Sequence, residues 1–156
     1  MLSINNGVRL EKKTVWQDEV GKISALRVGT LDYINDHITT LDVTEESESG
    51  DWVVYDHYSF DEDGILSKLN RTINILPGDR SVKSVFVIHN NRAKKRSTVA
   101  LKLSTGKLVS LSKEWLPHIP IITNAQAFHF SPLIDAKQFK IQILSQGRMC
   151  IQVSHP

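Results

Sequence analysis

Several features that define common protein classes are missing from this sequence of 156 residues. Its single cysteine, Cys150, allows no internal disulfide, and we expect it to be a small packing side chain in a strand. No apolar run approaches the roughly 18 residues of a membrane helix, which predicts no membrane insertion. The first residues, MLSINNGVRLEKK, lack the apolar core of a signal peptide. We therefore expect a soluble protein that is either cytoplasmic or exported with its signal peptide absent from this chain.

The motifs that mark common catalytic and metal sites are missing as well. The six histidines show no metal-binding spacing such as HExxH, and no serine lies in a nucleophile elbow. Ser104–Lys107 resembles part of a phosphate-binding loop, but leucine occupies positions 101 and 108, where that motif requires Gly and Ser or Thr. No glycine-rich fingerprint for a dinucleotide is present. We therefore predict no metal site and no cofactor.

Positive charge is scarce in the first half of the chain, and negative charge is scarce in the second. Residues 1–80 hold 8 Lys and Arg against 15 Asp and Glu, whereas residues 81–156 hold 11 against 2. Between Val28 and Ser67 there are eleven acidic residues and no Lys or Arg. Two interpretations remain open. The halves pair within one sheet and their charges offset locally, which we favour, or they form two poles, one of which recruits a charged partner.

The strongest pattern present is a β-hairpin in the stretch from Trp52 to Leu76. Asp63-Gly64 suits a two-residue turn with both residues at positive φ. Since side chains alternate along a strand, this turn creates one apolar face that is interrupted by an opposed acid–base pair. A slip of one residue would set apolar residues beside polar ones, so the register is well specified. The expected pairs are Phe60 with Ser67, Tyr58 with Leu69, Asp56 with Arg71, Val54 with Ile73 and Trp52 with Ile75.

The whole chain, residues 1–156, is expected to form a single, mainly β domain. Short links between strand-like segments predict an antiparallel meander of about eight strands. Strands are expected within residues 14–28 and 38–43, in the hairpin, over 82–88, 97–103 and 108–111, and in a second hairpin. That second hairpin has the loop Ser145–Gly147 and pairs Ile143 with Met149, Ile141 with Ile151 and Phe139 with Val153.

Three stretches depart from this strand pattern. The spacing of Leu31, Ile34 and Ile38 predicts one short helix near residues 30–38. Thr44–Asp51, which contains no apolar residue, and the polar stretch Asn90–Arg96 are both expected to be loops. Residues 112–134 contain three prolines among large apolar residues, which excludes regular helix or central strand. We expect this last segment to cover the core irregularly, or to form the wall of a pocket.

The opposed residues Asp56 and Arg71 are the polar pair of greatest interest. If their face is the core, they form a buried ion pair that specifies register, which is the interpretation we favour. If the face lines a cleft, the pair would hold a polar ligand, and we place Trp115, Phe128 and Phe130 in the same candidate binding site. His57 is expected to be an ordinary surface histidine, because strand alternation puts it on the face opposite Asp56.

Arg92, Lys94, Lys95 and Arg96 form a basic patch that would contact phosphates. No aromatic residue for base stacking lies within it, so nucleic acid is a disfavoured partner. We expect a non-catalytic binding or interaction protein whose partner is a protein or a small molecule, and a homo-oligomer is compatible with the sequence. Two alternatives remain. One is a small enzyme with a polar cleft around Asp56, His57 and Arg71, and the other is an accessory nucleic-acid binder that uses Arg92–Arg96.

Overall fold

The computed structural model describes residues 6–17, 22–34, 37–90, 92–113, 116–123, 139–143 and 149–153. These residues form a mainly β, antiparallel fold, as predicted, with no α-helix among them. Strands β1 to β7 pair in sequence order, and β9 joins the hairpin β8–β9 to β3. The nine strands are β1 (Asn6–Gln17), β2 (Lys22–Ile34), β3 (His37–Ser47), β4 (Trp52–Phe60), β5 (Leu66–Ile75), β6 (Arg80–His89), β7 (Arg92–Lys102), β8 (Phe139–Ile143) and β9 (Met149–Val153).

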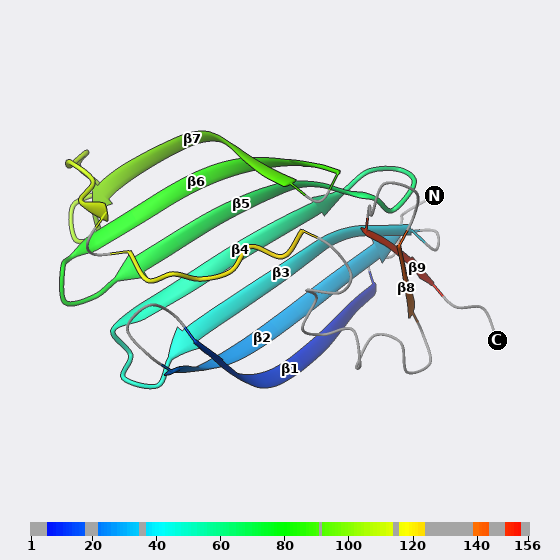
Figure 1. Ribbon diagram of the computed structural model, residues 1–156, viewed down its shortest axis with the longest axis horizontal. Coiled ribbons are helices and arrows are strands. Elements are labelled where there is room, and N and C mark those ends of the chain that lie inside the picture. The colour runs from blue at the N-terminus through cyan, green and yellow to red at the C-terminus, as the bar shows by residue number, and fades with distance from the viewer. Residues whose placement is uncertain are drawn as a thin grey trace.

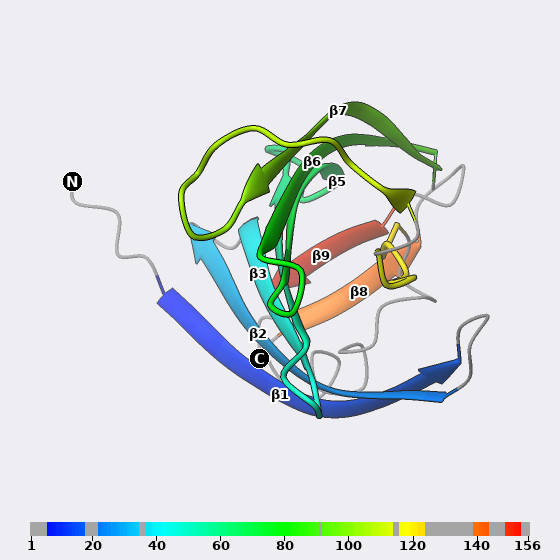
Figure 2. The ribbon, with the colours of Figure 1, turned by 90° about the vertical axis from the view of Figure 1, so that its left-hand side faces the viewer.

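The sheet is strongly curved, and the chain covers its concave side. Figure 2 shows β8, β9 and the segment that follows β7 on this side of the sheet. In Figure 1 this segment, drawn in yellow, passes over β5 and β4. We call residues 108–123 the strap, of which 114 and 115 are not described, and we call the face beneath it the inner face. Residues 112–123 of the strap belong to the region expected to cover the core irregularly, and the described part of the strap contains no regular strand or α-helix.

Alternating side chains of β4 and β5 supply much of the inner face. Along β4, buried residues alternate with more exposed ones from Trp52 to Phe60. Buried aliphatic and aromatic side chains each stabilise the fold by about 1.5–3 kcal/mol relative to exposure. One such cluster joins the sheet to the strap, because Ile119 packs on its buried residues and Leu116 packs against it. The sheet residues of this cluster are Trp52, Val54, Ile73 and Ile75.

The register of the central hairpin is confirmed from Trp52 opposite Ile75 to Tyr58 opposite Leu69. Its turn differs from the prediction, because Phe60 pairs with Leu66 after a register shift. The Asp61 carboxylate accepts hydrogen bonds from the backbone N–H groups of Asp63 (3.1 Å) and Ile65 (2.8 Å), so the turn begins at Asp61. Gly64 takes the left-handed conformation, with φ of 72°. The loop is therefore longer than the two residues expected.

The short helix expected near residues 30–38 is wrong. Residues 22–34 and 37–47 belong to β2 and β3, which pair with each other. Leu31 lies opposite Leu41 in the register of the two strands, so the two positions belong to neighbouring strands and not to one helical face. Hydrogen bonding to strands on both sides overrides a local spacing that also fits a helix.

Both polar stretches expected to be loops contain strand, the first over half of its length and the second from Arg92 onward. β3 continues to Ser47, and Glu45 and Ser47 are buried, so only residues 48–51 of the first stretch form the turn. β7 begins at Arg92, which leaves little more than Asn90 for the connection from β6. Polar composition was interpreted as loop, but cross-strand backbone hydrogen bonds hold polar residues in extended conformation as readily as apolar ones.

Two further expectations about turns and strands can be compared with the structure. Ser104–Lys107 belongs to the turn that follows β7, with Gly106 at φ of 68° and its N–H bonded to the carbonyl of Lys102 at 2.7 Å. The strand expected over 108–111 is reduced to a single bridge between Leu101 and Leu108. The C-terminal hairpin has the predicted register, with Cys150 on a strand, while its loop lies outside the described residues.

Candidate functional site

The residue pair that the sequence singles out is a buried ion pair on the inner face. β4 and β5 place Asp56 and Arg71 directly opposite each other. Arg71 Nε donates a hydrogen bond to Asp56 Oδ1 at 2.7 Å, and Nη2 donates to Oδ2 at 2.6 Å, which is bidentate geometry. Each side chain is only 6% exposed. The contacts therefore support the interpretation that favoured a core ion pair.

The strap completes the hydrogen bonding of Arg71. Nη1 donates to the carbonyl oxygen of Ile119 at 2.6 Å, and Nη2 donates to that of Pro120 at 3.0 Å. A buried guanidinium needs such partners, because an unsatisfied charge in the interior costs several kcal/mol. Arg71 thereby ties the strap to the sheet at a point where the two are far apart in sequence.

The neighbours of this pair keep Arg71 charged. Tyr58 Oη donates a hydrogen bond to Asp56 Oδ2 at 3.2 Å, and Glu45, which is 2% exposed, acts on Arg71 through its charge. Burial alone lowers the pKa of Arg71. The hydrogen bonds and charge of Asp56, helped by electrostatic interactions with Tyr58 and Glu45, outweigh this and raise the pKa above its ordinary value. Arg71 therefore stays ionised, with its donors directed at Asp56 and the strap.

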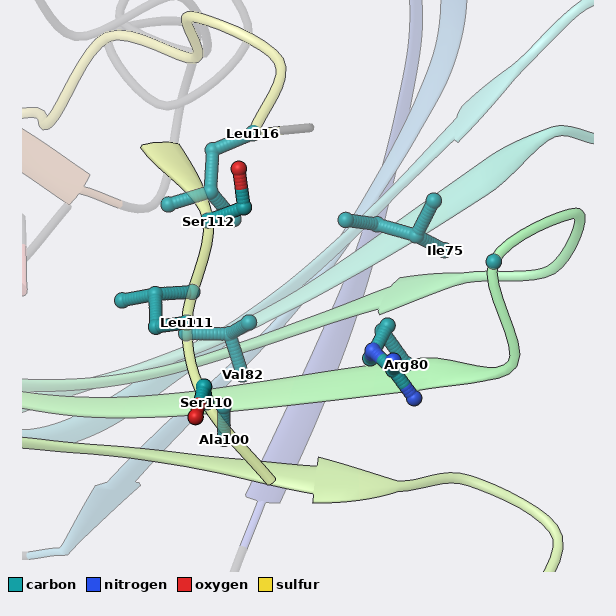
Figure 3. Close-up of a pocket in the computed structure, with 9 residues that line it drawn as sticks. Ile75, Arg80, Val82, Ala100, Ser110, Leu111, Ser112 and Leu116 are labelled. Carbon is teal, nitrogen blue, oxygen red and sulfur yellow. The ribbon is translucent and has the colours of Figure 1, made fainter. Parts of the chain in front are cut away.

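A pocket of about 230 Å³ lies between the strap and strands β5, β6 and β7. Figure 3 shows the strap residues on one side of it and the sheet residues on the other. Most of the lining side chains are aliphatic, and two serines lie on the strap. The sheet and the β5–β6 turn contribute Ile75, Gly78, Arg80, Val82 and Ala100, and the strap contributes Ser110, Leu111, Ser112 and Leu116.

Arg80 is the one charged residue among the described residues that line this pocket. Its side chain is partly buried and makes no hydrogen bond or ion pair with any residue that the structure describes. Its cross-strand partner is a second cation, Lys102. The pocket therefore has an apolar lining and, at its side, a guanidinium whose donors the described residues leave unused.

Asp79, the acidic residue that precedes Arg80, interacts with Ser104 and Lys102. Asp79 accepts hydrogen bonds from the backbone N–H (2.8 Å) and the hydroxyl (2.7 Å) of Ser104, and it lies 3.6 Å from Lys102 Nζ. The hydrogen bonds from Ser104, helped by Lys102, lower the pKa of Asp79 below its ordinary value. Asp79 thus holds the turn after β7 in place and is not a counter-ion of Arg80.

The structure brings together only part of the predicted binding set. Asp56 and Arg71 meet, whereas Trp115, Phe128 and Phe130 lie outside the described residues, so ligand binding by these five stays a prediction. His57 faces away from Asp56, and its Nδ1 lies 2.6 Å from Asp42 Oδ1 in a largely exposed pair. Arg80 is not among the predicted binding residues. Arg80 lies two residues before buried Val82, so strand alternation would have placed Arg80 on the inner face. The pocket could not be predicted in this way, because the wall opposite Arg80 comes from the strap.

The predicted basic patch lies on a strand and not in a loop. Arg92, Lys94, Lys95 and Arg96 are exposed on β7, which is the last strand of the path β1 to β7. None of the four is paired with an acidic residue among those described. The cations therefore mark one edge of the sheet.

The strand order separates the charges of the two halves of the chain. β3 and β4 come from the stretch without Lys or Arg, whereas Arg80–Lys102, which spans β6 and β7, has seven Lys and Arg and no Asp or Glu. β3 and β7 are four strands apart, about 19 Å along the sheet, which exceeds the screening length of physiological salt. β3 and β7 therefore do not offset each other directly, because a meander keeps each strand beside its neighbours in sequence. Asp79 of the first half and Lys102 of the second do pair, so both interpretations of the charge layout stay open.

No protein-family model matches the sequence, and neither the curated proteins nor the solved structures show a significant match. The described residues include no group of three or more side chains that could hold a metal ion. No helix in that part of the chain is long and apolar enough to cross a membrane. The function must therefore be argued from the pocket and the charges.

Proposed function

We propose that this protein binds a small amphiphilic anion in the pocket between the strap and β5–β7, without converting it chemically. Arg80 is the observation that carries the proposal, because its guanidinium has no partner among the described residues and lies beside an aliphatic pocket. A ligand anion would supply the charge-assisted hydrogen bonds that Arg80 lacks. Its apolar part would contribute about 25 cal/mol for each Å² removed from water.

The size of the pocket limits the ligand. A volume of about 230 Å³ corresponds to roughly seven or eight groups of water size at about 30 Å³ each. A short aliphatic or single-ring carboxylate has this size. The hydroxyls of Ser110 and Ser112 supply further donors at the strap side for a polar head group.

Binding is favoured over catalysis by the chemistry of the lining. No His, Cys, Asp or Glu lines the pocket among the described residues, so its serines have no neighbouring general base there. The enzyme alternative, a cleft around Asp56, His57 and Arg71, gains no support either. His57 lies on the other face, and the donors of Arg71 are directed at Asp56 and the strap.

Titration with hexanoate, followed by calorimetry or by amide NMR shifts, tests the proposal. A ligand of this size is expected to bind with a Kd of about 0.1–1 mM. Hexylammonium has the same tail and the opposite charge, so it should bind at least about tenfold more weakly. Equal binding of the two compounds would exclude a role for Arg80 as the anion partner.

Two substitutions locate the site, and a third is the matched control. Arg80→Met should weaken hexanoate binding by about tenfold or more, since it removes the charge and keeps the aliphatic stem. Ala100→Leu should also weaken binding, because the larger side chain occupies pocket volume. Arg92→Met removes the same charge from β7 outside the pocket and should leave the affinity unchanged. A wild-type affinity in the Arg80→Met protein would contradict the proposal.

A further inference from the structure

The residues that the structure describes pair with the outer edge of β7 along only part of its length. The Lys102 N–H donates to the Lys107 carbonyl at 2.8 Å, and the Val109 N–H donates to the Ala100 carbonyl at 2.9 Å. Within the described part of the chain, no backbone group pairs with the outer edge between Arg92 and Val99. Because backbone groups alternate in direction along a strand, the N–H of Thr98, two residues before Ala100, points outward from this edge. The edge therefore offers free hydrogen-bonding groups to another strand.

The uncovered part of the edge carries the basic patch on both faces of the sheet. Arg92 and Lys94 share one face, since they lie opposite His89 and Val87. Lys95 lies opposite Phe86, on the other face, and Arg96 falls in the register shift that follows. Cations above and below the plane of the sheet match an extended peptide lying in that plane, whose side chains also alternate between faces. A phosphate backbone would instead contact cations that share one face.

Charged side chains on an edge strand normally prevent sheet-to-sheet association, and here they also select the partner. Like charge disfavours pairing with the other end of the strand path, β1, whose sequence NGVRLEKKTVWQ is itself basic. A second copy of this chain is thus repelled at that edge, whereas an acidic segment is attracted. Exposed Val99 adds an apolar contact at the end of the uncovered stretch.

From these observations we infer that the open edge of β7, from Arg92 to Val99, binds an acidic extended segment of a partner protein as an additional strand. This mode combines backbone hydrogen bonds, which contribute affinity, with side-chain contacts, which contribute specificity. It is independent of the pocket, because neither the open edge nor the basic patch contributes to the pocket lining.

A synthetic ten-residue peptide of alternating Glu and Val or Thr is a suitable probe for binding to the full chain by NMR. Binding should protect the Thr98 amide from exchange and shift its resonance. The Val99 amide, which points toward β6, should change much less. A second peptide of the same charge, with proline replacing every Val and Thr, loses half of its backbone donors and is biased toward polyproline II, so it should bind at least tenfold more weakly. Equal binding of both peptides, or no saturation by roughly 1 mM, would overturn the inference.

Variants separate strand addition from simple charge attraction. The double substitution Lys94→Glu/Lys95→Glu should weaken peptide binding by about tenfold or more, whereas the control Lys107→Glu/Lys113→Glu changes the net charge equally outside the edge and should have little effect. Thr98→Pro removes an outward N–H without removing a backbone bond to β6, and it also removes the hydroxyl hydrogen bond between Thr98 and Ser84 (3.0 Å). Thr98→Val, which removes that hydroxyl and keeps the N–H, is the matched control: it should bind the peptide, whereas Thr98→Pro should keep the fold and lose the peptide. A single-stranded oligonucleotide that binds more tightly than the peptide, and equally well to Thr98→Pro, would assign the edge to nucleic acid instead.

Discussion

Arg71 and Arg80 both lie on the inner face, but they differ in burial, in hydrogen-bond partners and in the charges beside them. Arg71 has a bidentate carboxylate, two strap carbonyls and almost no exposure. Arg80 is less buried, lies across from Lys102 and has no partner among the described residues. A charge whose donors the fold already occupies stabilises the structure and leaves little for a ligand. A partly buried charge without a partner keeps its capacity to bind an anion.

The largest effect is expected from Arg71→Met. This change leaves the Asp56 carboxylate buried without its counter-ion and removes both bonds to the strap, so it should cost about 3–5 kcal/mol in the free energy of unfolding. Chemical denaturation of the variant and the parent measures this difference. The double variant Arg71→Met/Asp56→Leu should recover a large part of the loss, because it removes the uncompensated charge. An Arg71→Met protein with unchanged stability would show that the pair is not a structural element.

Arg80→Met is expected to have a much smaller effect on stability. With no hydrogen bond or ion pair to lose among the described residues, the free energy of unfolding should change by no more than about 0.5 kcal/mol. The same denaturation experiment measures it in the absence of ligand. A loss of more than about 2 kcal/mol would reveal a structural partner of Arg80 and remove the contrast with Arg71.

The smallest effect is expected when low pH protonates Asp79, the residue that precedes Arg80. The pKa of Asp79 is lowered, so its carboxylate contributes stability that is complete above the ordinary value of 3.8 and is lost as the pH falls through the lowered value. The amide resonance of Ser104 should therefore shift with a midpoint below pH 3.8, while the overall fold persists. In an Asp79→Asn protein this shift should be absent. A midpoint at or above 3.8 would contradict the hydrogen bonds from Ser104.

Predictions based on strand alternation succeeded where two strands follow each other directly. The pairing of Asp56 with Arg71 and that of Ile141 with Ile151 both follow from a turn and a period of two. Predictions based on composition are wrong at Glu45 and at Lys94, where polar stretches that suggest loops are strands. No local signal separates a polar strand from a polar loop, because the difference comes from hydrogen bonds to a neighbouring strand.

The sequence by itself determined which residues share a face, and so it brought Asp56 opposite Arg71. Only the tertiary structure decided how each arginine of that face is satisfied. The carbonyls of Ile119 and Pro120 reach Arg71 from nearly fifty residues further along the chain, and the strap also forms the wall opposite Arg80. Side chains alternate between the two faces of a single strand, so the face of each residue can be predicted from the local sequence. The partners of a buried or half-buried charge depend on which distant backbone packs above it, and no local pattern specifies that.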